Sequence, residues 1–254
     1  MADSATVAAS GPDTLDADVT AALAAFLAAK RAELTAMHPA LSAVVDEIER
    51  RCAGSPGRRP AYAYWAWRGC APAEDPADAP ADDPAGVPVD DGAVRRALSA
   101  LELLRVAAVE HADVAPGPAG PVPAIGRAIL SGDLALIWSA EVLATAGLPE
   151  ETLEAIGPVW DALRTGLATG SYLDLLRAAG GLGSGTPAES PTGWALRLGA
   201  ALAGADAAAL AACARIGTLL DEGADAERIR GAVAAAPLAE EAREALLALS
   251  STGS

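Results

Sequence analysis

The sequence predicts an all-α protein, and three observations support this. Alanine and leucine dominate the 254 residues, β-branched residues are sparse and Phe26 is the single phenylalanine, a composition that favours helix over strand. Apolar residues recur every three to four positions along most of the chain, which is the period of an amphipathic helix. The chain is long enough to bury a real core, and we expect one domain.

Two amphipathic helices are expected at the N-terminal side. Residues 1–13 are expected to form a disordered leader, and residues 14–254 to form a single helical domain. The first helix carries its apolar residues at helical intervals: Leu15, Val19, Leu23, Phe26, Leu27 and Leu34. The second restarts after Pro39 and ends at the glycines and proline of "AGSPG".

An acidic, proline-rich loop is expected at residues 71–91. It reads "APAEDPADAPADDPAGVPVDD", with a proline at every fourth residue from 72 to 88 and with acids but no base. The prolines exclude a helix, and no apolar face is available for burial. We interpret it as a disordered linker rather than a metal site at Asp82 and Asp83, because nothing rigid would hold the ligands.

Helical patterning resumes at residues 93–114, 126–146, 150–179 and 194–220, and a last helix is expected to begin near Pro237. Glycine and proline mark the breaks at "APGPAGPVPA" and "GGLGSGTPAESPTG". No period of about 20 to 50 residues repeats, which argues against a solenoid.

Charge and composition exclude several function classes. A formal net charge of −16 argues against a nucleic-acid partner, because binding to phosphate backbones depends on Lys and Arg. No leader with a basic and then an apolar region is visible, and no membrane span is expected, so we predict a cytoplasmic protein. Cys52, Cys70 and Cys213 have no CxxC spacing and are expected to be free thiols.

Four segments in the same order together resemble one family. "GRRPAYAYWAWRG" resembles a basic motif usually written GGKRxRP, and "ALELLRVAAVEHADV" resembles a helix with an ExxH element before a DDxxD motif. "GRAILSGDLALIWSAEVLATAGLP" resembles the next helix with its GD pair, and "TGSYLDLL" resembles GQxLD. Over roughly residues 15–203 the chain thus resembles the trans-polyprenyl diphosphate synthases, of the actinobacterial type.

The resemblance implies a fold and a chemistry. The implied fold is all-α, an isoprenoid-synthase-like helical bundle around a cavity, here shortened at the C-terminal side and usually dimeric. Family members condense isopentenyl diphosphate with an allylic diphosphate. Magnesium ions held between two aspartate clusters neutralise the departing diphosphate as its charge develops.

This sequence departs from both aspartate motifs. On the ExxH alignment the DDxxD aspartates fall on Ala112, Asp113 and Pro116, so one carboxylate of three remains. The arginine pair that usually follows is absent from "APGPAGPVPA". Glu110, His111 and Asp113 lie within one turn, but successive residues of a helix point about 100° apart, so we predict no metal site there.

A second aspartate motif is suggested only by "LLDEGAD", which places Asp221, Glu222 and Asp225 in a DExxD spacing. Gly223 interrupts it, and the segment after it resembles the extreme C-terminus of the family rather than its metal-binding helix. We therefore predict no catalytic residue and no metal ligand.

Four residues are candidates for substrate binding. Arg58 and Arg59 match the end of the basic motif and either hold a diphosphate through bidentate hydrogen bonds or form a solvated pair at a helix start. Arg105 replaces the ExxH histidine and either contacts a phosphate or forms a structural ion pair with Glu102 or Glu110. His111 stands where the family often has a histidine. Asp133 in "SGD" and Asp174 in "YLDLL" match positions typical of the family, and the simpler interpretation of each is a polar contact within a helix that faces a neighbouring helix.

The resulting function hypothesis is a catalytically silent polyprenyl diphosphate synthase homologue. It would act as the partner of a catalytic paralogue, or of a second copy of itself, or bind a prenyl chain or prenyl diphosphate, and it would need no cofactor. One alternative is an active prenyltransferase or terpene cyclase that uses Mg²⁺ on Asp113, Asp174 and Asp221. Another is an acidic helical adaptor whose loop at 71–91 binds a partner.

Overall fold

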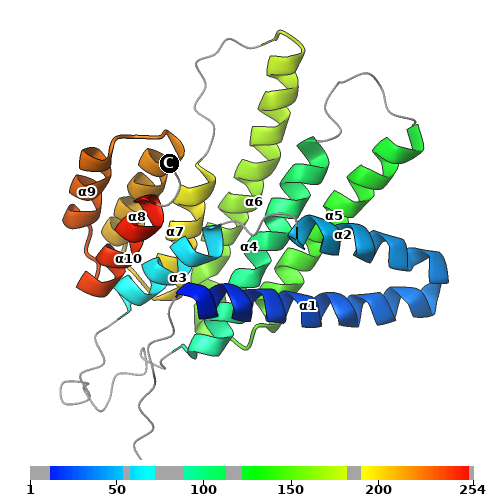
Figure 1. The fold of residues 1–254 in the computed structure, drawn as a ribbon, viewed down its shortest axis with the longest axis horizontal. Helices are drawn as coiled ribbons and strands as arrows, with labels where there is room; N and C mark the ends of the chain where they lie inside the picture. The colour runs from blue at the N-terminus through cyan, green and yellow to red at the C-terminus, as the bar shows by residue number, and fades with distance from the viewer. Residues whose placement is uncertain (1–11, 54–57, 72–88, 113–121, 182–189, 252–254) are drawn as a thin grey trace, which may run out of the picture.

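The computed structural model describes residues 12–53, 58–71, 89–112, 122–181 and 190–251 (Figure 1). Within these ranges it contains ten α-helices, one short 3-10 helix and no strand, which confirms the all-α prediction. Most of the predicted leader and of the loop at 71–91 lies outside the described residues. The first helix begins at Pro12, two residues earlier than expected.

The helices follow one another in the order expected, with two additional helices at 59–70 and 226–235 and with the helix expected at 194–220 divided into two. Their bounds are α1 Pro12–Met37, α2 Ser42–Ala53, α3 Arg59–Cys70, α4 Asp91–Ala112, α5 Val122–Thr145, α6 Glu150–Ala178, α7 Pro191–Leu202, α8 Ala207–Asp221, α9 Ala226–Ala235 and α10 Glu240–Ser251. The 3-10 helix, Pro39–Leu41, links α1 to α2.

The helices form two groups, which contact each other through α3 and α7 (Figure 1). α4, α5 and α6 stand side by side, and α1 with α2 crosses them as a helical pair. α7, α8, α9 and α10 gather on the other side, with α3 packed against α7, α10, α4 and α1. The start of α3 and the middle of α4, which carry three of the four candidate residues, therefore lie where the groups meet.

Helix α3 is buried almost completely, although its sequence starts with basic residues. Its aromatic side chains lie in the core: Tyr62, Tyr64, Trp65 and Trp67. On α7, Gly199 faces Ala63 so closely that a Cβ at position 199 would overlap the Ala63 carbonyl oxygen. The two helix backbones are therefore in direct contact, which only a residue without a side chain allows.

A four-residue connector, residues 203–206, contains the sequence Gly-Ala-Asp and corrects the prediction of one helix over 194–220. Gly204 has φ +70° and closes α7, and Asp206 caps α8 by accepting a hydrogen bond of 2.8 Å from the Ala209 amide. The same pattern recurs at Gly223, φ +64°, and Asp225, which caps α9. Glycine in the left-handed region followed by an aspartate cap is a helix stop and start. Helix α9 was not predicted because the Gly-Ala-Asp sequence at 223–225 was not interpreted as such a stop and start.

A buried arginine ties three helices together. Arg95 on α4 is 6% exposed and donates hydrogen bonds to Asp18 on α1 at 2.6 Å and to the Tyr64 hydroxyl on α3 at 3.0 Å. It also pairs with Asp91 in its own helix. Burial lowers the pKa of Arg95, but the carboxylates around it raise the pKa overall, so the guanidinium stays charged.

One described segment, Ile125–Thr145 in α5, is long and apolar enough to cross a membrane by length and composition. Its mean hydropathy is 1.4 and 39% of it is buried against the rest of the protein. Core helices of water-soluble proteins pass the same test. The absence of a membrane span therefore stays a prediction.

Candidate functional site

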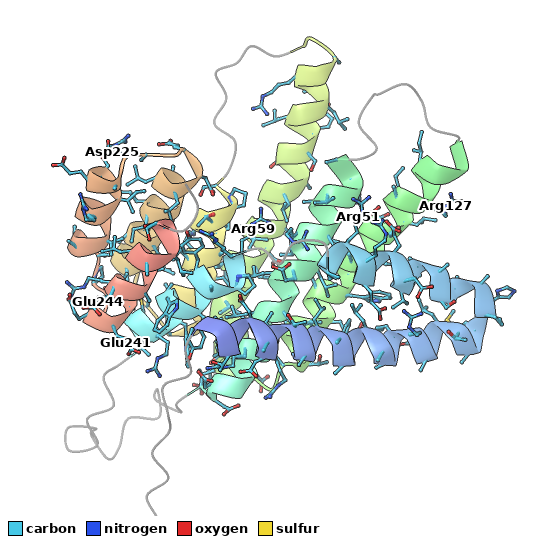
Figure 2. All side chains as sticks on the ribbon, viewed as in Figure 1. Arg51, Arg59, Arg127, Asp225, Glu241 and Glu244 are labelled. Atoms are coloured by element: carbon cyan, nitrogen blue, oxygen red, sulfur yellow. The ribbon has the colours of Figure 1, made fainter. Side chains whose placement is uncertain are left out.

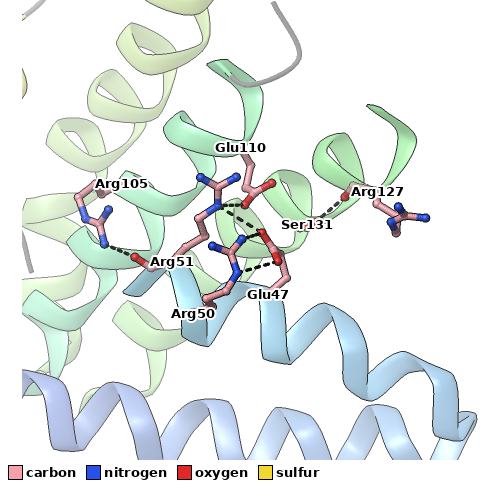
Figure 3. A network of polar contacts seen from close by, with 7 residues as sticks. All are labelled: Glu47, Arg50, Arg51, Arg105, Glu110, Arg127 and Ser131. Carbon is pink, nitrogen blue, oxygen red and sulfur yellow. Dashed lines mark hydrogen bonds and ion pairs between the residues drawn. The ribbon is translucent and has the colours of Figure 1, made fainter. Parts of the chain in front are cut away.

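The C-terminal end of α2 meets the C-terminal part of α4 in a network of ion pairs (Figure 3). Glu110 on α4 is 2% exposed, and its Oε1 lies 2.7 Å from Nε of Arg51 on α2. Arg51 also contacts Glu47, which pairs in turn with Arg50. A buried carboxylate must be compensated by a nearby cation, and Arg51 does this for Glu110. This carboxylate therefore holds α2 on α4.

Arg105 has the structural role that one of its two interpretations predicted. Its Nε donates a hydrogen bond of 2.8 Å to Glu102 Oε2. Its Nη2 donates a hydrogen bond of 2.9 Å to the carbonyl oxygen of Arg51 (Figure 3). Glu102 is 5% exposed, so the pair is largely withdrawn from water. Glu110, the other partner considered, pairs with Arg51 instead.

The two arginines at the start of α3 differ in their surroundings. Arg58 is exposed, and its Nη1 donates a hydrogen bond of 2.8 Å to the carbonyl oxygen of Leu249 on α10. Arg59 is half-buried near the middle of the molecule (Figure 2). Burial lowers the pKa of Arg59 by more than the nearby charges of Glu102 and Asp221 raise it, so the pKa is lowered overall. Arg59 thus lies near two carboxylates, and diphosphate binding by Arg58 and Arg59 stays a prediction.

His111 lies apart from these arginines, in the last turn of α4. Its Nε2 is 3.1 Å from Oδ1 of Asp133 on α5, so Asp133 makes the contact with a neighbouring helix that was predicted. Gly132 makes room for the ring, because a Cβ there would lie 2.6 Å from His111 Nε2. Six residues separate His111 from Arg105, about 9 Å along a helix. The structure does not gather all four candidates at one point.

Asp221, a proposed metal ligand in one alternative, holds the start of α7. Its carboxylate accepts hydrogen bonds from the Ser190 hydroxyl at 2.6 Å, the Thr192 hydroxyl at 2.6 Å and the Thr192 amide at 2.9 Å. Asp113 and the side chain of Asp174 lie outside the described residues. The part of the chain that the structure describes holds no group of three or more His, Cys, Asp or Glu residues able to bind a metal ion.

Comparisons with known proteins add to this geometry. No protein-family model and no curated protein matches the chain. Among solved structures, geranylgeranyl pyrophosphate synthase from Corynebacterium glutamicum, complexed with isoprenyl diphosphate and magnesium, matches with a TM-score of 0.67 at 19% identity. A putative geranylgeranyl pyrophosphate synthase from the same organism matches with a TM-score of 0.67 at 21% identity. The chain has the isoprenoid synthase fold.

The lengths of the matching proteins differ. The matches cover 83% and 82% of this chain but only 66% and 61% of the two Corynebacterium chains. The small subunit of geranyl diphosphate synthase from Antirrhinum majus matches with a TM-score of 0.57 at 16% identity, over 94% of this chain and 98% of that chain. This chain thus spans less than two thirds of each Corynebacterium protein and nearly all of the small subunit.

The sequence motifs and the fold agree in order. The basic segment opens α3, the ExxH-like segment lies on α4, the GD segment on α5 and the "YLDLL" segment on α6. Sequence reasoning missed Arg51, which pairs with Glu110 near the C-terminus of α4, and Glu47, which contacts Arg51. Only their place in the last turns of α2, close to α4 in the fold, reveals that role.

Proposed function

We propose that this protein is a non-catalytic member of an isoprenoid synthase assembly, in which it acts as the partner subunit of a catalytic chain with the same fold. The catalytic chain would hold magnesium and the diphosphates. This chain would bind the catalytic chain and change its conformation. It would thereby control the turnover rate of the catalytic chain or the length of the product that the catalytic chain makes. The proposal places the protein in the cytoplasm, together with the catalytic chain.

The observation that carries the proposal is how the structure uses its acidic side chains. Ionising an allylic diphosphate requires carboxylates that are free to bind Mg²⁺ in a near-octahedral arrangement. Here Glu110 pairs with Arg51, Asp133 contacts His111, and Asp221 accepts three hydrogen bonds at the start of α7. Moving any of them to a metal would break a contact between helices.

The match to a small subunit supports the same interpretation. The Antirrhinum protein is by name a small subunit of a geranyl diphosphate synthase, and the match spans 98% of it. Fold alone does not establish function. The likeness is nevertheless what we expect of a chain that keeps the scaffold and works in an assembly.

Helix α5 offers the surface that a partner chain of the same fold would cover. Leu130 and Ile137 lie seven residues apart on one stripe of the helix and are 63% and 60% exposed. Arg127 lies at the outer edge of the same helix (Figure 2). Large apolar side chains next to one another on a surface are typical of protein interfaces.

The test mixes the purified chain with a catalytic trans-polyprenyl diphosphate synthase from the same genome. Isopentenyl and allylic diphosphates with Mg²⁺ are supplied, and both complex mass and product length are measured. We expect no product from this chain alone, a mixed complex, and a product distribution that changes with the ratio of the two chains. Elongation by this chain alone, or a partner whose mass and products never change, would overturn the proposal.

Two variants locate the contact. Leu130→Glu puts a charge into the proposed interface and should weaken the mixed complex at least tenfold, the loss expected for a central interface residue. Met37→Glu is the control, because Met37 is 72% exposed at the far end of α1. Equal weakening by both variants would count against α5 as the surface.

A further inference from the structure

Two of the three cysteines meet in the fold although they lie far apart in the sequence. Cys70 is the last residue of α3, and Cys213 lies on the buried face of α8 together with Ala209 and Ile216. Both thiols are free, and the Cys213 thiol donates a hydrogen bond to the Cys70 sulfur. Eleven positions separate Cys70 from Arg59, about 16 Å along a helix, so this pair lies apart from the candidate site.

The packing around α7 holds the two thiols next to each other. Helix α7 packs against both α3 and α8. A Cβ at Gly217 of α8 would lie 2.2 Å from the backbone nitrogen of Gly193 on α7, so these two backbones touch as those of α3 and α7 do. The end of α3 is also fixed, because the Gly69 carbonyl oxygen accepts a hydrogen bond of 2.9 Å from the Ala239 amide. The backbones that carry the two sulfurs are therefore both held by direct contacts.

The surroundings of the two thiols give them different reactivity. Cys70 is half-buried, and the hydrogen bond from Cys213 lowers the pKa of Cys70 by more than burial and the charge of Asp206 raise it. Cys213 is 0% exposed, and both its hydrogen bond to Cys70 and its burial raise the pKa of Cys213. The thiol that is accessible and has the lower pKa attacks a disulfide first. Cys70 is therefore the attacking thiol, and Cys213 is placed to react with Cys70 afterwards.

We propose that Cys70 and Cys213 form a thiol–disulfide exchange site whose oxidant is a low-molecular-weight disulfide such as oxidised glutathione. The Cys70 thiolate attacks one sulfur of oxidised glutathione, breaks its S–S bond and forms a mixed disulfide, and one glutathione leaves as a thiolate. Cys213 then attacks the Cys70 sulfur and expels the second glutathione.

The atoms and electrons of this exchange balance. The first glutathione thiolate takes the Cys213 proton, and the second takes from water the proton that Cys70 released. The two protein thiols are oxidised to one disulfide, and oxidised glutathione is reduced to two glutathione molecules. The product is a reversible covalent link between α3 and α8, of the transient kind that cytoplasmic proteins use. This inference does not depend on the proposed partner function.

The experiment treats the folded, full-length protein with an excess of oxidised glutathione, then unfolds it in the presence of N-ethylmaleimide and maps the thiols by mass spectrometry. Cys52 on α2 is the internal standard, because burial raises the pKa of its thiol to about 12 and the other two cysteines contact each other. We expect the loss of two hydrogens, a disulfide between Cys70 and Cys213, and N-ethylmaleimide on Cys52 alone. Three labelled cysteines, or a disulfide that includes Cys52, would overturn the proposal.

Three single substitutions separate the roles of the cysteines. Cys213→Ser should stop the reaction at the mixed disulfide, so that one glutathione stays on Cys70. Cys70→Ser should leave Cys213 free, because Cys213 is 0% exposed. Cys52→Ser is the matched control and should form the link as the unchanged protein does. If Cys213→Ser is folded by circular dichroism and takes up no glutathione on Cys70, Cys70 is not the attacking thiol and the proposal is wrong.

Discussion

The contact between α3 and α7 allows a direct test of the packing. Substituting Gly199→Ala adds one Cβ, which would lie 2.7 Å from the carbonyl carbon and 2.9 Å from the Cα of Ala63, and would overlap the carbonyl oxygen. Non-bonded carbon atoms pack at about 3.5–4.0 Å. The two helices must therefore move apart by about 1 Å, and neither backbone can rotate out of the way as a side chain would.

The free-energy cost of Gly199→Ala follows from the contacts between α3 and α7. A gap of about 1 Å removes a quarter to a half of the dispersion energy of each contact across it, and overpacking in a core costs about 1–3 kcal/mol or more. We expect Gly199→Ala to lower the free energy of unfolding by about 3 kcal/mol. At this chain length that corresponds to a fall in Tm of about 6–12 °C.

Gly231→Ala in α9 is the matched control. A Cβ there meets nothing within 4 Å, so the substitution changes only backbone entropy and helix propensity. It should raise the free energy of unfolding by about 0.5–1 kcal/mol. Urea unfolding followed by circular dichroism measures both variants. If Gly199→Ala stays within about 0.5 kcal/mol of the unchanged protein, the helix backbones do not meet as described.

Three further outcomes are expected from the charged groups. Arg51→Met should cost about 3 kcal/mol because it removes the guanidinium that pairs with the buried Glu110, and Arg51→Met with Glu110→Leu should cost less than the single change; a double-mutant cycle by urea unfolding checks this. Burial raises the pKa of Glu47, but its pairs with Arg50 and Arg51 lower the pKa overall, below 4.5. The contribution of Glu47 to stability is therefore present above its ordinary pKa and is lost as the pH falls through the lowered pKa. The unfolding midpoints of Glu47→Gln and the unchanged protein should therefore converge as the pH is lowered through that range. Asp221→Asn should destabilise α7 by about 1–2 kcal/mol, with faster amide exchange at its first turn; unchanged exchange there would contradict the assigned role.

Two acidic residues show which structural roles could be predicted from the sequence and which could not. Asp221 and Asp225 have the spacing of a metal motif, yet one accepts hydrogen bonds from the start of α7 and the other caps α9. The second role was readable, because Gly-Ala-Asp is a local signal for a helix end and a new start. The first was not, since Thr192 is 29 residues away along the chain.

The helical class of this protein and the order of most of its helices follow from the sequence, because periodicity, glycine and proline act over a few residues. So does the placement of the four motif-like segments on α3, α4, α5 and α6. The tertiary structure alone decided that Arg51 pairs with Glu110 and that Arg105 pairs with Glu102. These depend on side chains from different helices meeting in a packed interior, where burial makes each charge choose a partner, and no local pattern encodes that choice.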